Sequence, residues 1–232
     1  MKNTPPSASE CLTRYLDMAR QRPQLFANPP GDIYEILLDP ARILRAQAEA
    51  RQRRAAGGLP HDDLRVGVLA RDPYVTVLRE AVRFPDGTHG LYNRLLVPFG
   101  VAMLPLIDDK VVLLDRFRHG TRTWHLEAPR GCADGDGGFE ADARRELAEE
   151  IGAEGIALTD LGLLHSSSGC LDETYHLYLA RIAAFGPPEA HEAIRELRLV
   201  PVAELEALIA TGELSDGPTL ACFLRARLRG HL

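Results

Sequence analysis

The spacing of apolar residues changes along the chain, from a helical period near the N-terminus to a strand-like pattern after Tyr74. Apolar residues recur every three or four positions over residues 9–21, which predicts a helix that ends before Pro23. Asp39-Pro40 is typical of a helix N-cap followed by proline, and it predicts a second helix, rich in Ala and Arg, that ends near Gly57-Gly58. The N-terminal region is therefore expected to be mainly helical.

Residues after Tyr74 predict many short strands and a few helices, separated by turn residues. Runs rich in Val, Thr, Ile and Leu predict strands at residues 74–84, 91–98, 101–107, 110–117, 124–127, 161–165, 174–182 and 192–200. Apolar spacing and capping residues predict helices at residues 139–151, 202–210 and 218–229. Because strands and helices do not alternate regularly, an α+β fold is expected rather than a doubly wound parallel sheet.

The change of pattern also suggests how the chain is divided. We expect residues 1–60 to form a helical N-terminal appendage and residues 61–232 to form the main domain. The hairpin within residues 61–98 is a candidate for dimerisation or for substrate binding. A chain of 232 residues is long enough for one domain with such an appendage.

Composition excludes several classes of function. The net charge is −6 and no basic block occurs, so binding to a nucleic-acid backbone is not expected. The longest apolar runs have the length of strands, so no membrane span is expected, and the polar, Pro-rich start lacks the apolar core of a signal peptide. The four cysteines include no CxxC pair, which is typical of reduced thiols in a cytoplasmic protein.

The predicted helix at residues 139–151 carries the most informative chemistry. Its apolar residues form a stripe, while Glu146, Glu149 and Glu150 are three and four residues apart and therefore share another side of the helix. Such like charges repel each other, and a divalent cation with a preference for oxygen ligands, such as Mg²⁺, would reverse that cost. Three glutamates alone are more often a solvated acidic face, so the neighbouring residues decide between the two interpretations.

Those neighbouring residues complete a known motif. Arg145-Glu146-Leu147-x-Glu149-Glu150-x-Gly152, with Gly131 fourteen residues before Arg145, resembles the Nudix box. That box reads Gly, five residues, Glu, seven residues, Arg-Glu-aliphatic-x-Glu-Glu-x-Gly. One position departs, because Gly137 stands where the box has its first Glu. Asp134 or Asp136 is a candidate replacement as partner of Arg145.

Further stretches resemble the ADP-ribose pyrophosphatase branch of the Nudix family, over roughly Tyr92 to Leu224. They are Trp124–Gly131, which resembles its Trp-x-x-Glu-x-Pro-x-Gly segment, Arg116-Phe117-Arg118, Ser167–Glu173 and Gly212–Thr219. The resemblance implies a Nudix-type α/β/α sandwich with a mixed central sheet. It implies hydrolysis of the diphosphate bond of ADP-ribose or another ADP-sugar with Mg²⁺ or Mn²⁺, giving a nucleoside monophosphate and a sugar phosphate. It also implies a homodimer.

The resemblance assigns roles to individual residues. The metal ligands it implies are Glu146, Glu149, Glu150 and the backbone carbonyl of Ala128. The catalytic residues it implies are Glu149, Glu150 and Glu173. The substrate-binding residues we expect are Arg118, Glu127 and Arg94. Glu127 has an alternative role, as a metal ligand or as the residue that orients Arg118. Other nucleoside diphosphate derivatives, such as GDP-mannose or a dinucleotide, are alternative substrates, and a non-catalytic nucleotide-sugar sensor is the alternative function.

Overall fold

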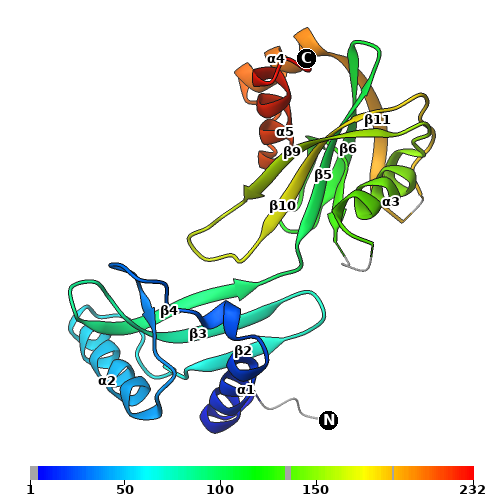
Figure 1. Ribbon diagram of the computed structural model, residues 1–232. Helices are drawn as coiled ribbons and strands as arrows, with labels where there is room; N and C mark the ends of the chain where they lie inside the picture. Colours follow the sequence, from blue (N-terminus) through cyan, green and yellow to red (C-terminus); the bar gives the residue numbers. More distant parts are fainter. Residues whose placement is uncertain (1–4, 134–136, 190) are drawn as a thin grey trace. The chain divides into compact units, whose positions relative to one another are not determined.

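The computed structural model describes residues 5–133, 137–189 and 191–232 (Figure 1). The chain packs into two compact units. The first contains Met1–Val97 together with Gly169–Asp172, and the second contains Pro98–Ser168 together with Glu173–Leu232. Residues 61–97, which we assigned to the main domain, thus pack with the N-terminal helices in the first unit.

The first unit combines helices with an antiparallel sheet. Its helical segments are α1 (Ala8–Gln21), η1 (Pro23–Phe26) and α2 (Pro40–Ala56). Its strands are β1 (Glu35–Ile36), β2 (Gly67–Arg71), β3 (Thr76–Arg83) and β4 (His89–Leu96). β3 pairs with β4 along its whole length, and its other edge pairs with β2 and with the short β1. Both predicted helices are present, whereas β1 and β2 were not expected from the sequence.

Apolar side chains of the two helices form the core of this unit. Tyr15 of α1 packs with Val68 and Leu78 of the sheet. Ile43 of α2 packs with Ala81 in a second cluster. Ser7 caps α1, since its side chain accepts the backbone N–H of Glu10 while the Glu10 carboxylate accepts the N–H of Ser7. Local capping and burial of one helix face therefore explain why these helices form where the sequence predicts them.

The second unit is built around a mixed sheet. Its strands are β5 (Gly100–Ile107), β6 (Lys110–Arg118), β7 (Thr123–Glu127), β8 (Arg130–Cys132), β9 (Ala157–His165), β10 (Thr174–Arg181) and β11 (Ile194–Pro201). The strand order is β11-β6-β5-β10-β9, with β7 paired to β6 and β8 paired to β5. β5 and β10 are parallel, and the other pairs are antiparallel.

Helices cover both faces of this sheet (Figure 1). They are α3 (Phe139–Ile151), α4 (Val202–Thr211) and α5 (Gly217–Leu228). Leu147 of α3 packs with Val101 and Met103 of β5 on one face, whereas α4 and α5 contribute Leu205 and Phe223 to the core on the opposite face. The second unit is therefore an α/β/α sandwich with a mixed sheet, as the sequence predicted.

Candidate active site

Helix α3 has the bounds that the sequence predicts. Ala143, Leu147 and Ile151 of its apolar stripe are fully buried in the core, and Phe139 is partly buried. Gly152 ends the helix in the left-handed conformation at φ 55°, which favours glycine. The three glutamates differ in exposure: Glu150 is 1 % exposed, Glu146 is 9 % exposed, and the side chain of Glu149 is 36 % exposed. The helix thus buries two of the three glutamates of the motif beside β8.

Glu146 occupies the space that a side chain at Gly131 would need. A Cβ atom built on Gly131 would overlap the carboxylate carbon and both carboxylate oxygens of Glu146. Glycine at the start of the Nudix-like motif therefore allows the backbone of β8 to lie directly against this carboxylate. Arg145 donates one hydrogen bond to Glu146 at 2.8 Å and another to Glu149 at 3.0 Å, so this arginine joins two of the three glutamates.

Glu150 lies between β6 and β8. One of its carboxylate oxygens pairs with Arg116, and the other accepts the backbone N–H of Arg130 at 2.9 Å. The same guanidinium of Arg116 also pairs with Glu192, in the segment before β11. Burial raises the pKa of Glu150 to about 7, in spite of the positive charge of Arg116. Burial also raises the pKa of Glu146.

A second ionic cluster lies at the turn between β7 and β8. Glu127 is 0 % exposed, and Arg118 holds its carboxylate with two hydrogen bonds, one of them from Nε at 3.0 Å. Arg130 also contacts Glu127, at 3.4 Å, and it pairs with Asp216 at 3.1 Å. The two predicted substrate-binding residues of this unit, Arg118 and Glu127, are thus brought into direct contact.

The other predicted residues occupy different surroundings. Ala128 is 1 % exposed in the same turn, next to Glu127. Glu173 accepts a hydrogen bond from Ser166 and another from the hydroxyl of Tyr175 at 3.2 Å. Arg94 belongs to the first unit, where it donates to Glu80 at 2.8 Å and to the carbonyl of Leu25 at 2.8 Å. The candidate partners Asp134 and Asp136 lie outside the described residues.

The sequence did not single out Glu192, Asp216 or Thr219 as site residues. Glu192 pairs with Arg116, which is 76 residues away in the sequence. Thr219 accepts the backbone N–H of Ala128, which is 91 residues away. Asp216 and Thr219 do lie in the Gly212–Thr219 stretch that resembles the ADP-ribose pyrophosphatase branch, although no role was assigned to them. Asp216-Gly217-Pro218-Thr219 also has the form of a helix N-cap with proline in the first turn. For Glu192 we find no such local feature.

The three glutamates of α3 have suitable ligand atoms for a divalent cation, and in this structure they form ion pairs with Arg116 and Arg145. Among the described residues, no three His, Cys, Asp or Glu side chains converge into a ready metal site. Carboxylate oxygens are nevertheless the ligands that Mg²⁺ and Mn²⁺ prefer, and Gly131 leaves the space that the Glu146 carboxylate uses. The donor set therefore fits a hard divalent cation that would compete with Arg116 and Arg145 for these oxygens.

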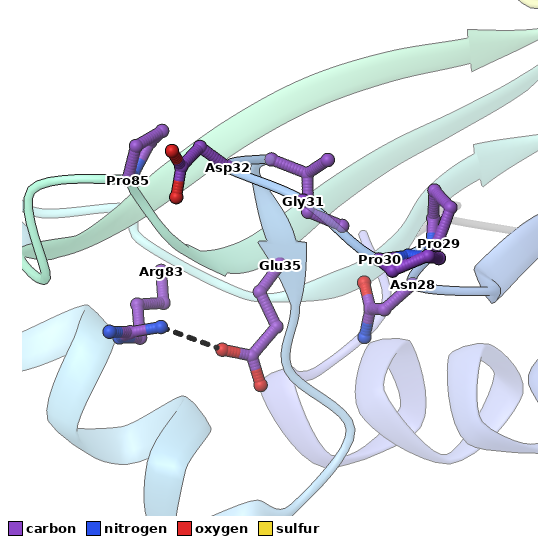
Figure 2. A pocket seen from close by; sticks show the side chains of 9 residues that line it. Asn28, Pro29, Pro30, Gly31, Asp32, Glu35, Arg83 and Pro85 are labelled. Atoms are coloured by element: carbon purple, nitrogen blue, oxygen red, sulfur yellow. Dashed lines mark ion pairs between the residues drawn. The ribbon is translucent and has the colours of Figure 1, made fainter.

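The first unit also contains a cavity of about 280 Å³ (Figure 2). The loop from Asn28 to Ile33 forms one side, and Glu35, Arg83 and Pro85 complete the lining. Arg83 and Glu35 face each other at 3.6 Å, as the dashed line in Figure 2 marks. None of the predicted site residues lines this cavity.

Among the helices of the described residues, none combines the length and the apolar character that a membrane span requires.

The chain is similar to known proteins over most of its second unit. The model of the NUDIX domain family matches residues 97–222, more than half of the chain. An ADP-ribose pyrophosphatase of Mycobacterium tuberculosis is 33% identical over 152 residues, which cover 62% of this chain and 72% of that protein. The ADP compounds hydrolase NudE of Escherichia coli is 29% identical over 121 residues, covering 51% of this chain and 64% of that protein.

Two further matches extend the comparison. An ADP-ribose pyrophosphatase of Bacillus subtilis is 31% identical over 102 residues, covering 44% of this chain and 55% of that protein. A crystal structure of an ADP compounds hydrolase has a TM-score of 0.61 and 23% sequence identity, and the match covers 72% of this chain and 94% of that chain. This structural likeness shows a shared fold.

Proposed function

The chain belongs to the NUDIX domain family and is a pyrophosphohydrolase of that family, and from this premise we propose that it hydrolyses the diphosphate bond of ADP-ribose or another ADP-sugar. The products would be AMP and a sugar phosphate. The observation that carries the proposal is that two glutamates of α3 pack against the backbone of β8. The carboxylate of Glu146 lies against Gly131, and Glu150 accepts the backbone N–H of Arg130. The names of the relatives, which act on ADP-ribose or ADP compounds, support the substrate class.

We further propose Mg²⁺ as the cation, with Mn²⁺ as a substitute. The residues that would hold it are Glu146, Glu149, Glu150 and the carbonyl of Ala128. A bound divalent cation supplies neutralisation of the diphosphate charge and lowers the pKa of a bound water molecule. That chemistry is needed because the negative charges of a diphosphate repel an attacking water molecule.

The remaining residues would bind and orient the substrate. Two donors of the Arg118 guanidinium hold the buried carboxylate of Glu127, which fixes the direction of the group. The remaining N–H donors of Arg118 would bind phosphate oxygens. Glu173 is our candidate for the general base, since the hydroxyls of Ser166 and Tyr175 hold its carboxylate in place. Glu192 is a second candidate, because Arg116 places it beside Glu150. Arg94 stays a proposed substrate-binding residue.

A panel of nucleotides tests this function. The protein is incubated with Mg²⁺ and ADP-ribose, another ADP-sugar, GDP-mannose, a dinucleotide or ATP, and the released nucleoside monophosphate is measured. We expect the ADP-sugars to be hydrolysed fastest, to AMP and a sugar phosphate, and water enriched in ¹⁸O to label only one product. Faster hydrolysis of ATP would contradict the substrate class. Tight binding of ADP-ribose without turnover would instead indicate a sensor.

We also propose that the protein is a cytoplasmic homodimer. The hairpin of residues 61–98, which contains β3 and β4, is the candidate dimer element, and closed two-fold symmetry is usual for homodimers. Light scattering at micromolar concentration is expected to give twice the mass of the chain. A monomeric mass would contradict the assembly and would leave the proposed reaction untouched.

A further inference from the structure

The turn between β7 and β8 is held by helices that cover opposite faces of the sheet. On the α3 side, the backbone N–H of Arg130 donates to Glu150 at 2.9 Å. On the α5 side, the backbone N–H of Ala128 donates to the hydroxyl oxygen of Thr219 at 2.8 Å. The residue to which we assign a metal-binding carbonyl, Ala128, is therefore fixed by a side chain far away in the sequence.

The hydroxyl of Thr219 can make these contacts in one direction only. It is fully buried, and it donates to Asp216 Oδ2 at 2.6 Å. An ionised carboxylate can only accept hydrogen bonds, so the single hydroxyl proton must point to Asp216. A lone pair of the hydroxyl oxygen is then left for the N–H of Ala128. Asp216 thus determines which way the hydroxyl of Thr219 faces.

Asp216 is itself held at two further points. Its Oδ2 also accepts the backbone N–H of Thr219 at 3.0 Å, which makes Asp216 the N-cap of α5. Its Oδ1 pairs with the side chain of Arg130 at 3.1 Å, which leads back to the turn between β7 and β8. The start of α5 and this turn are therefore linked twice, once through Thr219 and once through Arg130.

The neighbouring proline completes the constraint on the Ala128 carbonyl. Pro129 restricts the backbone of the residue before it to an extended conformation, and the carbonyl of Pro129 accepts the N–H of Met103 at 3.0 Å. With the N–H of Ala128 fixed by Thr219, the backbone is held on both sides of the Ala128 carbonyl. The direction of this carbonyl then depends on the hydroxyl of Thr219.

We propose that Thr219 and Asp216 are positioning residues, which orient the Ala128 peptide so that its carbonyl is available to the cation. This inference rests on the proposed function, because it gives that carbonyl its role. In this role the two residues would act through the backbone at Ala128 rather than by touching the substrate or the cation. Residues that orient metal ligands in this indirect way commonly change metal affinity about 10-fold to 100-fold when they are replaced.

Direct measurement of Mn²⁺ affinity tests the proposal in the absence of substrate. Thr219→Val keeps the shape of the side chain and removes the hydroxyl, whereas Thr219→Ser keeps the hydroxyl. By electron paramagnetic resonance, we expect Thr219→Val to weaken Mn²⁺ binding about tenfold or more and Thr219→Ser to remain within about threefold of wild type. We also expect faster hydrogen exchange at the amide of Ala128 in Thr219→Val only.

A helix cap in the first unit provides the matched control. Asp39 caps α2 by accepting the N–H of Arg42 at 2.9 Å and is followed by Pro40. Asp39→Ala is expected to lower the Tm by a few degrees and to leave the Mn²⁺ affinity unchanged. This control separates loss of a helix cap from loss of the contact with Ala128.

Wild-type Mn²⁺ affinity in a folded Thr219→Val protein, or unchanged exchange at the Ala128 amide, would overturn the proposal. If Thr219→Val does not fold, Asp216→Ala is measured in the same way against Asp39→Ala, and unchanged affinity there overturns it equally. The proposed function fails separately, when the wild-type protein binds Mn²⁺ but hydrolyses no ADP-sugar. Absence of Mn²⁺ binding by the wild type would overturn both.

Discussion

Each unit of the molecule buries a glutamate beside an arginine. Glu80 in the first unit is 3 % exposed, and its Oε1 accepts hydrogen bonds from the Tyr15 hydroxyl at 3.1 Å and from Arg94 at 2.8 Å. Glu150 in the second unit is 1 % exposed and is held by Arg116 and by a backbone N–H. Burial raises the pKa of both carboxyl groups. The local chemistry of the two sites is thus nearly the same.

Their surroundings differ in the balance of charge. The guanidinium of Arg94 also contacts the Leu25 carbonyl and the ring of Phe26, while its buried Nε has no hydrogen-bond partner among the described residues. At this site one carboxylate thus meets one arginine. Around Glu150, Arg116 also pairs with Glu192. The neighbouring Arg145 pairs with two further glutamates, Glu146 and Glu149.

In the second site, four glutamates therefore share two arginines in the described contacts. This excess of negative charge lowers the stability of the folded state. The comparison shows that the second site differs from the first by its excess of carboxylates over arginines, rather than by burial itself.

Replacing the two buried glutamates should separate their roles most strongly. We expect Glu150→Gln to lower kcat about 10²-fold or more, because Glu150 is a proposed ligand to the charge-neutralising cation. Glu80→Gln should keep kcat within about twofold at saturating ADP-ribose, because its partner Arg94 is proposed to bind substrate, so that a disturbance there raises KM rather than lowering kcat. Both values are measured with ADP-ribose at saturating Mg²⁺. Equal losses of kcat in the two variants would remove the distinction between the sites.

Gly131 offers a second way to disturb the acidic site without removing a charge. The methyl group of Gly131→Ala would overlap the carboxylate of Glu146 and force it to move. Because small misplacements of catalytic groups are costly, we expect kcat to fall about 10-fold to 100-fold. Gly120→Ala is the matched control, since a Cβ there meets open space. Normal kcat in Gly131→Ala would show that Glu146 need not occupy this position.

The local pattern of the chain was enough to predict the helix of the site, but not the contacts that complete it. Helix α3 has the predicted bounds because its apolar period and Gly152 are local features. β9 begins at Ala157, four residues before its predicted start at residue 161, and β8 was missed because it contains only three residues. Glu192 and Thr219 reach their partners across many residues, and that packing leaves little trace in a local pattern.

The third prediction concerns the stability of the first unit. Glu80→Ala leaves the guanidinium of Arg94 and the hydroxyl of Tyr15 without their shared acceptor in a largely buried position. Removing one member of such a pair typically costs about 3 kcal/mol, which we expect as the fall in the free energy of unfolding. Asp17→Asn, in the exposed pair of Asp17 with Arg20, should cost under about 1 kcal/mol. Urea denaturation at neutral pH gives both values, and similar costs would mean that burial adds nothing to the Glu80 pair.

The smallest expected effect is the pH dependence of the Glu80 contribution. Burial raises the pKa of Glu80 above its ordinary value of 4.5, so the native state keeps this proton to a higher pH than the unfolded chain does. The native state then binds more protons than the unfolded state, and its free energy of unfolding falls as pH rises through this window. The contribution of Glu80 is fully present below pH 4.5 and decreases above it. The cost of Glu80→Gln should therefore be smaller at pH 7.5 than at pH 5.

Glu35 provides a control of opposite sign for this measurement. Its hydrogen bond with Arg42 lowers the pKa of its carboxyl group, so its contribution is lost only as pH falls below about 4.5. The cost of Glu35→Gln should consequently be nearly the same at pH 5 and pH 7.5. Urea denaturation of both variants and the wild type at the two pH values gives the comparison. A cost of Glu80→Gln that grows with pH would contradict this prediction. It would mean that the attraction of Arg94 for the charged carboxylate outweighs the cost of burying that charge.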